Sequence, residues 1–202
     1  ASITPKILVV RFGHLVNAVP GSVAGLVKAH QEHGSLSLKE VLRPAIKLAK
    51  NGFPVSYDLN YILEWGKGSM LANEASKNKF YDDKAKPLAV DKIFKQPKLA
   101  RTLQLISAKG KRGFYEGKIA DWIVEDSSMN GGLITKKDLV SYQAKERLPI
   151  ETTYRGYKIV SMAPAASGGL VLLQTLNVLE NFDLTKSGHN SASSIHLLSE
   201  AM

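Results

Sequence analysis

The residues best suited to binding chemistry lie in a run of small side chains between a strand and a helix. Ala165 to Gly169 carry little side-chain volume, so another group can approach their backbone closely. A helix that starts after a glycine turn can present its N–H groups to an anion. Ser167, Gly168 and Gly169 are therefore candidate substrate-binding residues, and the alternative is a plain tight connection between strand and helix.

The elements around this run follow from local patterns. Bulky, partly alternating residues predict two strands on either side of a break at Arg155-Gly156, and Pro164 ends the second strand. Apolar residues then recur at helical spacing, which predicts a helix with an inward face. The β-favouring residues are Tyr154, Tyr157, Ile159, Val160 and Met162, and the helical ones are Val171, Leu172, Thr175, Leu176 and Leu179.

Other polar residues with catalytic or metal-binding potential are isolated. His30 and His33 are three residues apart on a predicted helix and could share a metal, but no third ligand is nearby. Asp82-Asp83 lies in a lysine-rich stretch, where a solvated pair is expected. His196 could act as an acid or base, although a packed histidine on a helix face is the commoner case. We therefore expect no metal and no cofactor.

Several motifs in sequence order resemble one known family. The run Ala163-Pro164-Ala165-Ala166-Ser167-Gly168-Gly169 is similar to a proline-proline-proline-serine-serine-glycine-glycine segment of the γ-glutamyltranspeptidase (glutathione hydrolase) family, and departs from it at the three alanines. Tyr154 to Tyr157 matches the family's tyrosine-arginine-glycine-tyrosine. Further matching stretches are Val19 to Leu26, Gly113 to Tyr142 and Leu176 to Leu184.

The resemblance implies γ-glutamyl transfer or hydrolysis, with glutathione and other γ-glutamyl compounds as substrates. Family members are N-terminal-nucleophile hydrolases, in which a precursor cleaves itself and the new terminal threonine of the small subunit attacks. Backbone amides stabilise the oxyanion. An arginine upstream of the matched region holds the substrate's α-carboxylate.

Carried over by position, neither catalytic element falls within this sequence. Arg11 precedes the matched part and does not stand in the family's arginine-glutamate context. Thr152-Thr153-Tyr154 resembles the cleavage site only superficially, because it aligns with the strand before the tyrosine motif. We therefore expect no catalytic residue in this chain, which alone should be inactive.

The resemblance also predicts the organisation of the chain. We expect residues 14–202 to be part of a large-subunit domain and residues 1–13 to be an unassigned segment. The fold class is α+β, a helix-rich part of a four-layer αββα sandwich whose sheet the strands of 148–162 join. The implied partner is the small subunit of the same precursor, and the implied location is periplasmic or secreted. The final helix has no C-cap residue, so we expect a fragment.

Composition narrows the alternatives. The chain has 202 residues, 44% hydrophobic and 22% charged, which is ordinary for a globular protein. No apolar run approaches the roughly 20 residues of a membrane span, and Ile7 to Val10 is too short for a signal peptide. Cysteine is absent, which excludes disulfides and zinc–thiolate sites.

The net charge of +9 raises nucleic-acid binding as one alternative function. Because the lysines look scattered in the sequence and aromatics make up only 7%, we expect no nucleic-acid partner. The second hypothesis is a non-catalytic binding or scaffold module derived from the family, favoured by the alanines at 163, 165 and 166.

Local signals predict most of the remaining elements. Helices are expected after Ser22 up to Gly34, from about Pro44 to Asn51, from Tyr57 to Trp65, from Pro97 to Gly110, before Gly131-Gly132, after Thr135, and over 191–202. Residues 66–95 should be a surface excursion. The inward residues predicted for these helices are Val23, Leu26, Val27, His30, Ala45, Ile46, Leu48, Ala49, Leu99, Leu103, Ile106, Ile119, Ile123, Val124, Leu139, Tyr142, Ile195, Leu198 and Met202.

Overall fold

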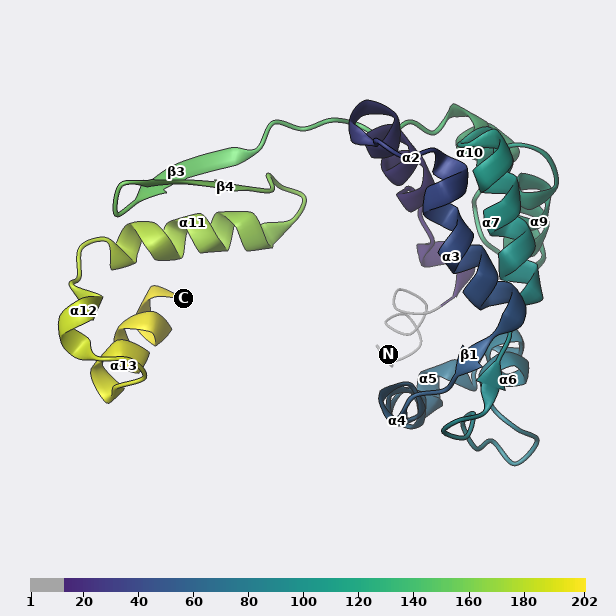
Figure 1. Ribbon diagram of the computed structural model, residues 1–202, viewed down its shortest axis with the longest axis horizontal. Coiled ribbons are helices and arrows are strands. Elements are labelled where there is room, and N and C mark those ends of the chain that lie inside the picture. The colour runs from purple at the N-terminus through teal and green to yellow at the C-terminus, as the bar shows by residue number, and fades with distance from the viewer. Residues whose placement is uncertain (1–12) are drawn as a thin grey trace, which may run out of the picture. The chain divides into compact units, whose positions relative to one another are not determined.

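The computed structural model describes residues 13–202, which divide into two compact units, 13–144 and 145–202 (Figure 1). The predicted strand Ile7 to Val10 and the predicted role of Arg11 lie outside the described residues. No helix within residues 13–202 is long and apolar enough to cross a membrane.

The first unit is almost entirely helical. Its only strands within the described residues, β1 and β2, form a short antiparallel pair. Its elements are η1 (His14–Val16), α2 (Ser22–His33), α3 (Leu38–Asn51), β1 (Phe53–Pro54), α4 (Tyr57–Trp65), α5 (Lys67–Met70), α6 (Glu74–Phe80), β2 (Ile93–Phe94), α7 (Pro97–Lys109), α8 (Arg112–Tyr115), α9 (Gly117–Met129) and α10 (Lys136–Ser141).

The second unit is a hairpin covered by a helix. Strands β3 (Ile150–Tyr154) and β4 (Tyr157–Ser161) pair antiparallel around Arg155-Gly156, and α11 (Ser167–Leu179) packs against both. Helices α12 (Leu184–Ser187) and α13 (Ala192–Ala201) follow, with α13 against α11 (Figure 1). The predicted α+β class, rich in helix, is confirmed.

Helix caps account for several boundaries that the sequence predicted. Ser37 and Thr135 each form a capping box, with Glu40 and Asp138. The side-chain hydrogen bond from Ser37 lowers the pKa of Glu40, and that from Thr135 lowers the pKa of Asp138. Ser56 caps α4, whose bounds match the prediction.

Pro44 does not start a helix, contrary to the prediction, but lies inside the continuous helix α3. A proline there removes one hydrogen bond and costs about 3 kcal/mol. The capping box at Ser37 and the extensive packing of α3 along α7 offset that cost. Residues 66–95, the predicted surface excursion, contain the regular elements α5, α6 and β2.

The inward faces of some helices differ from the prediction. In α2 the buried residues are Ala24 and Val27, whereas Leu26 is 72% exposed. In α3 only Ala49 is buried, and Leu48 is 53% exposed. The facing helix fixes which flank is covered, and spacing alone does not reveal it. Val171, Leu172, Ile195, Leu198 and Met202 are likewise exposed, as are Ala45 and Leu99, whereas Leu173 is buried.

The centre of the first unit is the buried Tyr115. Its hydroxyl donates to the carbonyl of Pro20 at 2.5 Å and accepts from the N–H of Ala24 at 3.1 Å. Its ring stacks on Tyr142, with 5.7 Å between centroids, and packs with Leu139 in the main core cluster. Burial raises the pKa of Tyr115. One side chain thus joins the start of α2 to α8 and α10.

We predict that Tyr115→Phe lowers the free energy of unfolding by about 1–3 kcal/mol, because it leaves the buried N–H of Ala24 and the carbonyl of Pro20 without their partner. Urea denaturation measures the change. The matched control is Tyr142→Phe, since the Tyr142 hydroxyl has no hydrogen-bond partner within residues 13–202. Equal losses in the two variants would contradict the account.

Candidate functional site

The three predicted site residues form the first turn of α11. Ser167, Gly168 and Gly169 are already helical, so the helix begins three residues earlier than the small-residue turn suggested. The N-cap, Ala166, has extended backbone angles and makes no side-chain capping bond. Because the first N–H groups of a helix have no partner within it, this end of α11 carries partial positive charge.

Gly168 and Gly169 have different surroundings, although they are adjacent. A Cβ on Gly169 would lie 2.1 Å from the carbonyl oxygen of Met162 and 2.9 Å from the Oγ of Ser161. A Cβ on Gly168 would meet no atom within 4 Å. The close approach expected from the sequence is therefore made at Gly169, and the approaching group is the end of β4 in the same chain.

A hollow of about 700 Å³ lies on the side of the segment before Ser167. Its wall includes Ala163, Ala165 and Ala166, and its basic side chains are Lys145 and Arg147. Val160, Ser161, Met162 and Pro149 complete it, whereas Ser167, Gly168 and Gly169 do not line it. Two cations beside an uncapped helix start favour an anion such as a carboxylate.

The threonine pair lies in a strand, as predicted. Thr152 and Thr153 belong to β3, and the Thr152 Oγ1 donates to the Oδ1 of Asn177 on α11 at 2.8 Å. Glu180, the C-cap residue of that helix, accepts from the N–H of Arg155 at 2.9 Å. These two hydrogen bonds hold the hairpin against α11, so the hydroxyl of Thr152 stabilises the packing of the strand on the helix.

The remaining sequence candidates are not brought together. His30 Nε2 is hydrogen-bonded to the carbonyl of Leu36 at 2.8 Å, while His33 is exposed. Asp82 accepts from the N–H groups of Lys84 and Lys86, which lower the pKa of its carboxyl, the bond from Lys86 most. Within residues 13–202, no group of three or more His, Cys, Asp or Glu side chains could hold a metal ion.

His196 is exposed on α13, contrary to the expectation of a packed histidine. Only Ser194 of that helix is buried, because its side chain turns back to the carbonyl of Gly188 at 2.8 Å. Among residues 145–202, His196 makes no hydrogen bond or ion pair with another side chain, so the structure shows no acid–base couple there.

Sequence reasoning missed a pair that joins η1 to α9. His14 Nε2 lies 2.8 Å from the Oδ2 of Asp126, beside a hollow of about 370 Å³ that the buried Ser127 also lines. The Ser127 Oγ accepts from the N–H of Ile134 at 3.2 Å. Among the described residues it makes no hydrogen bond to His14, so the three do not form a nucleophilic relay. A separation of 112 residues left no signal in the sequence.

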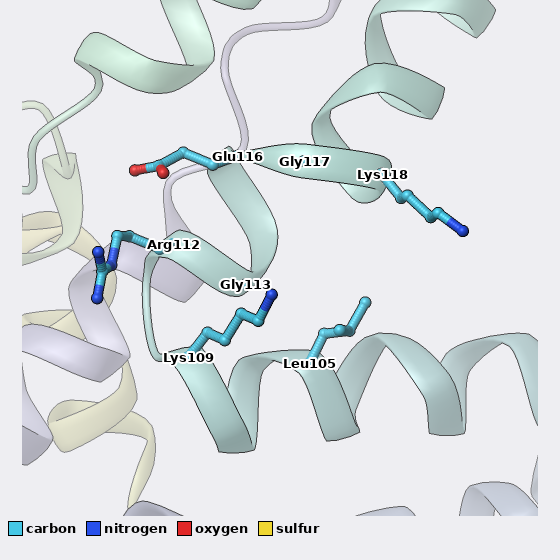
Figure 2. Close-up of a pocket in the computed structure, with 7 residues that line it drawn as sticks. All are labelled: Leu105, Lys109, Arg112, Gly113, Glu116, Gly117 and Lys118. Atoms are coloured by element: carbon cyan, nitrogen blue, oxygen red, sulfur yellow. The ribbon is translucent and has the colours of Figure 1, made fainter.

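A second large hollow, of about 750 Å³, lies where α7, α8 and α9 meet (Figure 2). Gly113 forms its floor because it packs directly on α7, where a Cβ would lie 2.2 Å from the carbonyl oxygen of Leu105. Lys109, Arg112 and Lys118 surround it, with Glu116 as the carboxylate. Figure 2 shows that Arg112 and Lys118 extend in opposite directions, so these side chains do not converge on one small ligand.

Comparison with known proteins identifies the class of fold first. The chain superposes on the crystal structure of the Helicobacter pylori γ-glutamyltranspeptidase with a TM-score of 0.91 and 40% identity, covering 96% of this chain and 56% of that one. The described residues are thus a helix-rich α+β part of an N-terminal-nucleophile hydrolase fold.

The family follows from the sequence comparisons. A family profile described as Gamma-glutamyltranspeptidase matches residues 5–202, so the match begins inside the segment 1–13. The chain therefore belongs to the γ-glutamyltranspeptidase family, as the motifs predicted.

Curated relatives of the family carry different names. The chain is 40% identical over 188 residues to the glutathione hydrolase proenzyme of Escherichia coli, covering 93% of this chain and 32% of that protein. It is 37% identical over 185 residues to an acylase ACY 1 proenzyme of a Pseudomonas species, covering 92% and 33%. The chain spans about a third of the length of the curated relatives it matches.

We predict opposite effects for alanine at the two site glycines. Gly169→Ala should destabilise the second unit by about 1–3 kcal/mol, because its Cβ would clash with the Met162 carbonyl. Gly168→Ala should stabilise α11 by up to about 1 kcal/mol, since alanine is the better helix former and the space is open. Hydrogen exchange of the α11 amides measures both. Similar effects from the two variants would contradict this placement.

We also predict that Ala166→Ser stabilises α11 by about 0.5–2 kcal/mol, because its hydroxyl can accept from a free N–H of the first turn. Ala165→Ser, one residue before the cap, is the control and should change little. Hydrogen exchange of the α11 amides, measured at increasing denaturant concentration, compares the stability of the helix in the two variants. No gain in the cap variant would show that this helix end is already satisfied.

Proposed function

We propose that this chain is the middle part of the large subunit of a γ-glutamyl-transferring or γ-glutamyl-hydrolysing enzyme. The observation that carries the proposal is the family match over residues 5–202 together with the close superposition on the Helicobacter pylori enzyme. The substrates proposed are glutathione and other γ-glutamyl compounds. Because the chain spans a third of its relatives, residues 14–202 are proposed as a partial domain.

The nucleophile is proposed to lie outside this chain, on a small subunit that begins with threonine. The name proenzyme, carried by the Escherichia coli and Pseudomonas relatives, supports a processed precursor. Thr152 and Thr153 lie within β3, so their nitrogens belong to peptide bonds. Neither has the free amine that an N-terminal threonine nucleophile uses as its base. The proposed location is periplasmic or secreted.

Exposed apolar residues on α11 and α13 support the proposal that other segments of the enzyme pack against this unit. Leu170, Val171 and Val178 of α11 and Ile195 of α13 are each between 44% and 52% exposed. Apolar groups of this size, gathered on neighbouring elements, are commonly covered by other parts of a protein. We propose that the segments completing the sandwich cover them and extend the β3–β4 sheet.

We predict that the purified 202-residue chain does not release the aniline from a γ-glutamyl anilide above the uncatalysed rate. The chemical reason is that the mechanism proposed for the complete enzyme uses a threonine hydroxyl with its own free amine as base. A colorimetric assay measures release. As positive control, the Escherichia coli glutathione hydrolase is assayed alongside.

Turnover by the chain alone that persists after repurification would overturn the proposal. A further arm expresses the chain inside a precursor completed with the remaining segments of that relative. Restored turnover, which disappears when the new terminal threonine is changed to alanine, would support the assignment of this chain to the large subunit.

A further inference from the structure

One helix pair of the first unit is strongly basic. Helix α3 carries Lys39, Arg43, Lys47 and Lys50, all exposed, and its only carboxylate is Glu40. Glu40 is engaged in the capping box, where it accepts from the N–H and the hydroxyl of Ser37. Helix α7, which packs along α3 (Figure 1), adds Lys98, Arg101 and Lys109 and no carboxylate.

These cations are not neutralised by ion pairs. Within residues 13–202, none of the seven forms a salt bridge, whereas Lys136, Lys158 and Lys186 each pair with a carboxylate. Residues 1–12 contain no Asp or Glu that could supply a partner. The carboxylate of Glu40 interacts electrostatically with Arg43, and neither helix carries another carboxylate. The helix pair therefore keeps an excess of positive charge, which favours a negatively charged partner.

The cations of α3 form an ordered row, although they look scattered in the sequence. Lys39, Arg43 and Lys47 follow one another at four-residue steps, so they lie on one flank of the helix about 6 Å apart. An extended polypeptide places every second side chain on the same side, at about 6.6 Å. The two spacings match closely enough for consecutive charges to pair.

The row is less suited to nucleic acid or to a membrane. Neither α3 nor α7 contains an aromatic residue on which bases could stack. The exposed apolar residues of α3, Val41 and Leu48, lie on the flank opposite to the cations, so a membrane could not engage both flanks together.

We propose that the α3 row of Lys39, Arg43, Lys47 and Lys50, supported by the field of α7, is a docking surface for an extended acidic polypeptide. The recognised chemistry is a series of side-chain carboxylates on one edge of the partner. This inference does not depend on the proposed γ-glutamyl chemistry.

Fluorescein-labelled poly-L-glutamate is the probe, and its anisotropy is followed as the 202-residue chain is added. The test variant is Lys39→Gln/Arg43→Gln/Lys47→Gln. The control is Lys136→Gln/Lys158→Gln/Lys186→Gln, which removes the same charge from ion-paired positions. Circular dichroism verifies that both retain the helical content of the parent.

We expect the test variant to bind about tenfold more weakly and the control to change by less than about twofold. Binding should weaken as ionic strength rises from about 0.05 M to about 0.3 M. Equal weakening in both variants would show that net charge alone attracts the probe and would overturn the proposal. Tighter binding of duplex DNA or of anionic lipid vesicles than of poly-L-glutamate would also overturn it.

Discussion

The buried hydroxyl of Tyr115 is the contact on which the first unit depends. It satisfies the carbonyl of Pro20 and the N–H of Ala24, which lie more than ninety residues earlier in the chain. The ring at the same time packs with Leu139 and Tyr142. A polar group in the core is stable only when its partners are in place, so this hydroxyl fixes how α2, α8 and α10 meet.

The second unit depends on a different constraint, the absence of a side chain at Gly169. Helix α11 can start directly after β4 because its backbone passes close to the carbonyl of Met162. Thr152 and Glu180 then tie the hairpin to the helix. The same small-residue run that indicated a binding loop in the sequence thus also has a packing role. Of the three candidate site residues, Ser167 and Gly168 are exposed and Gly169 is buried.

Local chemistry explains which elements could be predicted from the sequence. Ser56 and Thr135 mark helix starts because a cap depends on residues three positions away. Pro44, Leu26 and Leu48 were misjudged because the packing of neighbouring helices decides continuity and burial. His14 and Asp126 left no trace, since their contact is made only in the folded chain. The family motifs were recognisable from the sequence. The polar candidate residues, in contrast, lie apart in the described residues and form no catalytic group.

The central claim is that this chain works as one part of a processed enzyme. The most direct measurement is the intact mass of every polypeptide that co-purifies with this sequence from its natural source, recorded under denaturing conditions with N-terminal sequencing. The account predicts a companion polypeptide that begins with threonine. A single polypeptide containing this sequence, with no companion and no threonine at its terminus, would contradict the account.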